Sequence, residues 1–68
     1  MLPYQERVVQ ERAELVDRLQ KLTNFIESNP IYPTLNLIDQ SLMVTQQCVM
    51  TMLINVLGTR IEYFDKEK

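Results

Sequence analysis

Six side chains in this sequence have the chemistry to bind a small ligand that carries rings and phosphates. They comprise one aromatic ring, four cations and one hydroxyl: Tyr4, Arg7, Arg18, Lys21, Thr23 and Arg60. A tyrosine ring can stack on a base or on another ring. A guanidinium can bind a phosphate through two parallel hydrogen bonds. These residue types favour binding over catalysis.

Several of these residues also have a purely structural interpretation. Tyr4 could act as a hydrophobic staple over the start of a first helix. Arg18 and Lys21 follow Glu14 and Asp17 by four residues, which is the favourable order for salt bridges within a helix. Their charges could therefore be the solvated ends of such pairs. Both interpretations stay open on the sequence alone.

Arg60 stands apart because it follows twenty uncharged residues, 40–59. Its charge either reaches water beyond an apolar helix or lies at a seam between subunits. Symmetry would then repeat this single arginine as a pair or a ring, and such a cluster suits a phosphate. This is the strongest local indication of a ligand.

The sequence contains no arrangement that would make it an enzyme. There is no histidine, no glycine-rich phosphate loop and no cluster of metal ligands, and Cys48 is the only cysteine. Acidic pairs such as Glu11 with Glu14 lie beside basic residues, whereas general acid catalysis needs a buried carboxyl. We therefore expect no catalytic residue, metal or cofactor. Cys48 is predicted to pack as a small apolar residue in the core.

The elements that position these residues are predicted to be two helices in one all-α domain, residues 1–68. Apolar residues at helical spacing indicate an amphipathic helix over about 4–28, in which only Arg12 interrupts the apolar stripe. Two prolines make residues 29–36 an irregular connector. Asn36 is the expected N-cap of a second helix over about 37–64, and residues 65–68 form a polar tail. This pattern predicts an antiparallel helical hairpin.

The second helix is apolar over too much of its circumference to be covered by the first helix alone. It carries two adjacent stripes, Ile38, Leu42, Val49, Leu53, Val56 and Phe64, and beside them Met43, Met50, Ile54, Leu57 and Ile61. A helix that is apolar on most sides must be buried on most sides. A chain of 68 residues also supplies little core of its own. The sequence therefore predicts a homo-oligomer in which other subunits supply the cover that the first helix cannot.

Composition also indicates where the protein acts. The uncharged run is as long as a membrane span, but eight amides and hydroxyls within it would be costly in lipid. The N-terminal residues lack the basic and apolar pattern of a signal peptide. A net charge of −2 disfavours binding to a DNA or RNA duplex. We expect a cytoplasmic protein that binds neither membrane nor duplex nucleic acid.

Four segments resemble a known family of small helical phage proteins. These segments are YQERVVQERAEL, LQKLTNFI, the NP of the connector and VLGTRIEYF. They are similar to the anti-CBASS sponges, CBASS being the cyclic-oligonucleotide-based antiphage signalling system of bacteria. The resemblance covers most of the chain, from Tyr4 to Phe64.

This resemblance implies a homohexamer that sequesters cyclic dinucleotides, and in some members cyclic trinucleotides, in the host cytoplasm without cleaving them. By similarity, Tyr4 would stack on a base and Lys21 would meet a phosphate, although Arg18 could take the role of Lys21. Thr23 and Arg60 would line a second kind of pocket for larger cyclic ligands. The alternative to a sponge is a helical assembly or scaffold protein that acts through protein–protein contacts.

Overall fold

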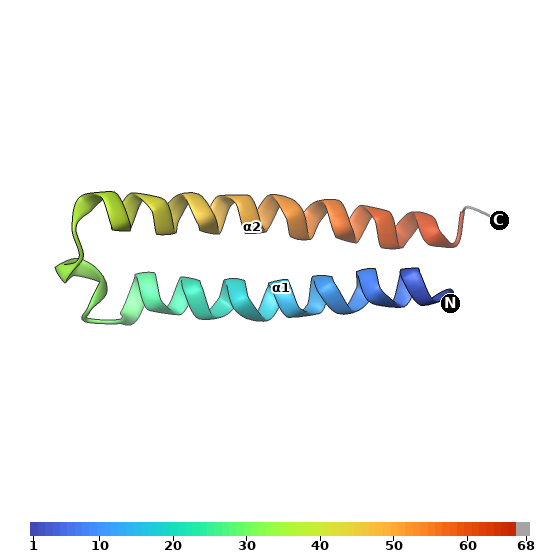
Figure 1. Ribbon diagram of the computed structural model, residues 1–68, viewed down its shortest axis with the longest axis horizontal. Coiled ribbons are helices and arrows are strands. Elements are labelled where there is room, and N and C mark those ends of the chain that lie inside the picture. The colour runs from blue at the N-terminus through green and yellow to red at the C-terminus, as the bar shows by residue number, and fades with distance from the viewer. Residues whose placement is uncertain (67–68) are drawn as a thin grey trace.

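The computed structural model describes residues 1–66 as two long antiparallel helices (Figure 1). Helix α1 spans Pro3–Ser28, a single 3₁₀ turn, η1, spans Tyr32–Thr34, and helix α2 spans Leu37–Phe64. The hairpin measures 51 × 15 × 14 Å, and the start of α1 and the end of α2 lie at the end away from the connector. The prediction of an all-α hairpin with a short connector is confirmed.

Local sequence signals determine where the helices begin and end. Pro3 is the first residue of α1, where its missing N–H would have had no helical partner. Helix α1 ends at Ser28, before the Asn29–Pro30 pair that disfavours helical geometry. The Asn36 side chain accepts a hydrogen bond of 2.8 Å from the Asp39 N–H and so caps α2 as predicted.

Gln40, in the first turn of α2, ties the connector to that helix. Its side-chain amide donates to the carbonyl oxygens of Tyr32 at 3.3 Å, Pro33 at 3.4 Å and Leu35 at 2.9 Å. The Tyr32 hydroxyl in turn donates to the Gln40 carbonyl oxygen at 3.4 Å. Tyr32 also packs edge-to-face on Phe25 of α1, with ring centroids 6.2 Å apart. The reversal of the chain is therefore held by both helices.

We expect Gln40→Ala to lower the free energy of unfolding by about 1–2 kcal/mol, because it removes hydrogen bonds that satisfy connector carbonyls. Gln46→Ala is the matched control, since Gln46 is exposed on the same helix. Thermal unfolding by circular dichroism at one protein concentration measures both variants. Equal midpoints for the two would contradict the role of Gln40.

The core of the single hairpin is small and lies toward its open end. Val8 of α1 packs with Leu57 and Phe64 of α2, and Leu57 is the most buried of them at 2% exposed. The apolar residues of α2 that face α1, hereafter the inner stripe, are buried or half-buried: Met43, Met50, Ile54, Leu57 and Ile61. Phe64 was predicted to belong with the other stripe but lies in this core.

Five further apolar residues of α2 form an outer stripe that the hairpin leaves uncovered. Its members are Ile38 at 73% exposed, Leu42 at 61%, Val49 at 57%, Leu53 at 40% and Val56 at 56%. By length and composition α2 could also cross a membrane, with only 11% of its most apolar stretch buried in the hairpin. Helix α1 alone therefore does not cover α2. This is the result that the sequence of α2 predicted.

Hydroxyl groups in α2 turn back onto their own helix. Thr45, Thr51 and Thr59 each donate to the carbonyl oxygen four residues earlier, at 2.9, 2.9 and 3.1 Å. A hydroxyl bonded in this way keeps a partner when its surroundings become dry. These threonines therefore do not prevent α2 from packing against another protein surface.

Candidate functional site

Two contacts mark one edge of the α1–α2 interface, hereafter the Arg12 edge. The Arg12 Nε–H donates to the Ile54 carbonyl oxygen at 3.2 Å, and this guanidinium lies against Gly58. Further along, the Gln47 side-chain amide donates to Thr23 Oγ1 at 2.9 Å. These contacts place Arg12 and Thr23 on the same side of the hairpin.

Tyr4 and Phe64 mark the opposite edge, hereafter the Tyr4 edge, at the open end of the hairpin. Their rings meet edge-to-face, with centroids 5.9 Å apart and planes at 79°. Tyr4 nevertheless remains 41% exposed, so part of its ring is available for stacking. The structural and ligand-binding interpretations of Tyr4 are therefore compatible. Its ring contact is with Phe64, at the end of α2.

Two of the three candidate cations of α1, Arg7 and Arg18, lie toward the Tyr4 edge. A helix turns about 100° per residue, so residues three, four or seven apart share a face. Arg7 follows Tyr4 by three residues and Arg18 follows it by fourteen. Lys21 comes nine residues after Arg12 and therefore lies opposite to it, on the solvent side of α1. All three side chains are exposed.

Arg60 of α2 projects on the same side of the hairpin. It follows Leu53 by seven residues and Val56 by four, and so it continues the outer stripe. It precedes Phe64, which contacts Tyr4, by one turn. The outer stripe and four of the six predicted site residues, Tyr4, Arg7, Arg18 and Arg60, therefore share one face. Lys21 lies on the solvent side of α1. Thr23 belongs to the other edge.

One chain does not bring these residues into a single pocket. Tyr4 and Lys21 are seventeen residues apart on one straight helix, which is about 26 Å at ~1.5 Å per residue. Thr23 lies beside Gln47, and Arg60 is thirteen residues further along α2, or about 20 Å at the same rise. Both separations exceed the size of a cyclic dinucleotide. Any site that combines these residues must draw them from different chains.

The charged surface of α1 differs in one respect from prediction. Lys21 forms the predicted salt bridge with Asp17, at 3.1 Å, whereas Glu14 accepts from the Gln10 side-chain amide at 3.3 Å. Within residues 1–66 no ion pair joins Glu14 to Arg18, so that prediction is wrong. The Asp17–Lys21 pair is highly exposed, and such pairs contribute only ~0–1 kcal/mol. The side chains of Lys21 and Arg18 can therefore turn readily toward an anion.

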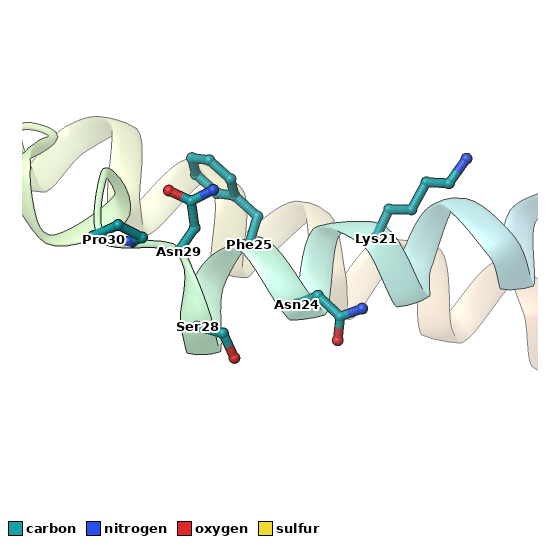
Figure 2. Close-up of a pocket in the computed structure, with 6 residues that line it drawn as sticks. All are labelled: Lys21, Asn24, Phe25, Ser28, Asn29 and Pro30. Atoms are coloured by element: carbon teal, nitrogen blue, oxygen red, sulfur yellow. The ribbon is translucent and has the colours of Figure 1, made fainter.

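A shallow depression lies beside Lys21 at the connector end of α1 (Figure 2). It has a volume of about 430 Å³ and is lined by Lys21, Asn24, Phe25, Ser28, Asn29 and Pro30. Figure 2 shows the Lys21 side chain extending outward from α1 and the Phe25 ring turned toward the connector. The depression offers a cation and an aromatic edge, but no enclosure that would hold a ligand without a second chain.

Thr23 lines a separate depression on the Arg12 edge, together with Leu19, Gln47, Cys48, Thr51 and Met52. Its oxygen accepts from Gln47, and its own hydroxyl proton can still be donated to a ligand. Cys48 is exposed here, so the prediction that it packs in the core of the chain is wrong. It lies on the side of α2 that α1 does not cover.

Arg12 is a cation that the sequence reasoning left out of the candidate site. Its position within the apolar stripe of α1 marked it only as an interruption. The structure places its guanidinium across the helix interface, where it contacts the backbone of α2. No group of histidine, cysteine or acidic side chains suited to a metal ion occurs within residues 1–66.

The chain matches a known protein family over nearly its whole length. A family model described as Sequestin matches residues 2–63. Comparisons with curated proteins and with solved structures found no match.

Proposed function

Because the chain belongs to the Sequestin family, we propose that it binds cyclic dinucleotides and cyclic trinucleotides and sequesters them without cleaving them. The family name indicates a sequestering protein. The resemblance to anti-CBASS sponges supplies the ligand class and the biological role. In this proposal the protein acts in the host cytoplasm, where it removes the second messenger that would activate CBASS.

The placement of the candidate residues carries this proposal. Tyr4, Arg7, Arg18 and Arg60 share a face with the outer stripe, and Lys21 lies on the solvent side of α1, yet these residues are spread along a 51 Å hairpin. Packing of outer stripes from different chains would bring the open end of one hairpin close to the middle of another. Rings and cations that are far apart in one chain would then meet at a seam between chains.

A homohexamer is the assembly that the resemblance implies, and its symmetry suits the proposed ligand. A cyclic dinucleotide has two phosphates and two base faces. Across a two-fold axis each protein residue acts twice, so one tyrosine and one cation per chain serve both halves of the ligand. A few residues per chain are therefore enough for tight binding.

The net charge of −2 does not prevent the capture of an anion at such a seam. Exposed carboxylates are screened beyond a Debye length of about 8 Å at physiological salt. Two cations that contact the ligand directly act at much shorter range, where charge-assisted hydrogen bonds are strong. Local pairing therefore outweighs the weak overall repulsion.

Calorimetric titration with a panel of cyclic di- and trinucleotides tests the proposed function. We expect tight binding of at least one of them, and chromatography after heat denaturation should recover that ligand intact. The absence of binding heat across the whole panel would exclude the sponge. Recovery of a linear product would show an enzyme.

Lys21→Gln and Arg18→Gln decide which cation contacts the phosphate. We expect Lys21→Gln to weaken binding about 10-fold or more, since a hydrogen bond to a charged group contributes ~1.5–3 kcal/mol. Lys66→Gln, which removes an exposed cation at the end of the hairpin, is the control. A larger loss in Arg18→Gln would assign the phosphate to Arg18. Unchanged affinity in both variants would contradict a phosphate contact on this part of α1.

The exposed outer stripe also favours a second candidate function, that of a helical assembly or scaffold protein. In that case the stripe would dock on a different protein and the cations would be solvated. Light scattering separates the two functions. A closed hexamer supports the sponge, whereas a monomer that associates only with a heterologous partner supports the scaffold.

A further inference from the structure

Arg12 holds a positive charge in an otherwise apolar part of the helix interface. The residues one turn away from it on α1 are Val8, Val9, Leu15 and Val16. Its side chain is half-buried, and its Nε–H donates a 3.2 Å hydrogen bond to the Ile54 carbonyl oxygen. This setting fixes the guanidinium but does not neutralise it.

No carboxylate within the described chain balances this charge. Helix α2 has no acidic residue between Asp39 and Glu62. Glu62 lies one turn beyond Gly58 and forms no ion pair with Arg12, and the ion pair found within residues 1–66 is that of Lys21 with Asp17. A partly desolvated cation is costly unless an anion pairs with it. The charge of Arg12 is therefore not neutralised within the described hairpin and can pair with an anion from outside it.

Gly58 makes this position of Arg12 possible. A Cβ atom at residue 58 would come within 3.2 Å of Arg12 Nε and within 3.7 Å of Cζ and Nη2. Glycine within a helix is less favourable than alanine, and the backbone of Gly58 is ordinary helix with no positive φ. The absence of a side chain at this residue therefore serves the close approach of the guanidinium.

The terminal nitrogens of Arg12 are available to a ligand. Within residues 1–66, every buried side-chain nitrogen and oxygen has a hydrogen-bond partner. The two Nη groups of Arg12 have no such partner in the hairpin, so they are in contact with solvent. With Nε engaged by α2, these groups form a fork of known orientation. Such a fork matches the two oxygens of a phosphate.

We infer that Arg12, positioned by Gly58, binds a phosphate of the sequestered ligand at the Arg12 edge. This inference rests on the proposed function and adds a contact on the side opposite Tyr4. Thr23 lies on this same edge, so the hairpin offers ligand contacts on both edges. A ligand held here does not compete with one held at the Tyr4 edge.

Removing the Arg12 charge tests the contact. Arg12→Gln should weaken binding of at least one cyclic di- or trinucleotide by about 10-fold or more, and Arg12→Lys should recover only part of that loss because lysine lacks the planar fork. Lys66→Gln is the control for loss of one positive charge. Unchanged affinity in a folded Arg12→Gln would overturn the inference. So would a change in its oligomeric mass before ligand is added, because the partner of Arg12 would then be a second copy.

Gly58→Ala provides a test in which stability and binding move in opposite directions. The added Cβ displaces the flexible Arg12 side chain, while alanine favours the helix. We expect an equal or higher thermal midpoint together with a several-fold loss of affinity. A more stable protein with unchanged affinity would show that the guanidinium position does not matter for binding.

Failure of the proposed function can be told apart from failure of this inference. If the wild-type protein binds no cyclic oligonucleotide, the proposed function fails, and a titration with pyrophosphate followed by NMR then decides on Arg12. A saturable shift of the Arg12 Nε–H resonance, larger than the shifts of the other arginine Nε–H resonances, would support an anion site. No shift would overturn it.

Discussion

Leu53→Asp is expected to dissociate the proposed oligomer while leaving the hairpin helical. Leu53 belongs to the outer stripe and is already 40% exposed within one chain, so the hairpin tolerates a carboxylate there. In an interface between chains the same carboxylate would be buried without a partner, which costs about 3–5 kcal/mol per copy. Light scattering should give the mass of a single chain, and circular dichroism should still show helix.

Asn55→Asp is the matched control for this variant. It adds the same charge two residues away, where Asn55 projects to the other side of α2. We expect it to retain the oligomer. A second comparison is Leu57→Ala, which removes a side chain that is 2% exposed and should destabilise the hairpin itself by about 2–5 kcal/mol. An intact oligomer of Leu53→Asp would show that the outer stripe is not an interface.

Tyr4→Ala is expected to lower the affinity for a cyclic dinucleotide by at least 10-fold with the oligomer intact. Stacking of one base on an aromatic ring contributes ~1–3 kcal/mol, and a two-fold site would use Tyr4 twice. The contact with Phe64 is also lost, and such ring pairs contribute ~0.5–1.5 kcal/mol to stability. Calorimetry measures the affinity, and light scattering at the same temperature measures the assembly.

Tyr4→Phe separates the ring from its hydroxyl. It keeps both the stacking surface and the contact with Phe64, so binding should stay within a few-fold of the wild-type affinity. If Tyr4→Ala instead dissociates the oligomer into single chains, Tyr4 is an assembly residue and the stacking role is wrong. Equal affinity of Tyr4→Ala and the wild type would exclude stacking directly.

Much of the fold was predictable because its signals are local. Pro30 and the Asn36 cap fix the ends of the helices through backbone geometry that neighbouring residues determine. The salt bridge of Lys21 with Asp17 follows from helical spacing alone. The excess of apolar surface on α2 was also readable, because helical spacing shows its width before any partner is known.

The features that were missed depend on how the two helices are rotated against each other. Sequence spacing placed Phe64 with the outer stripe, but the contact with Tyr4 and Val8 draws it into the core. The same rotation decides that Arg12 crosses the interface over Gly58. It also decides that Cys48 faces outward. A pattern along one helix carries no information about this angle.

Native mass spectrometry with a cyclic dinucleotide tests the central claim, that several chains together hold an unaltered ligand. We expect a species of six times the 8.1 kDa chain mass that carries whole ligand masses, with no ligand on single chains. Denaturing the same sample should release the ligand at its original mass. A spectrum of single chains only, or of a hexamer without ligand, would contradict the account.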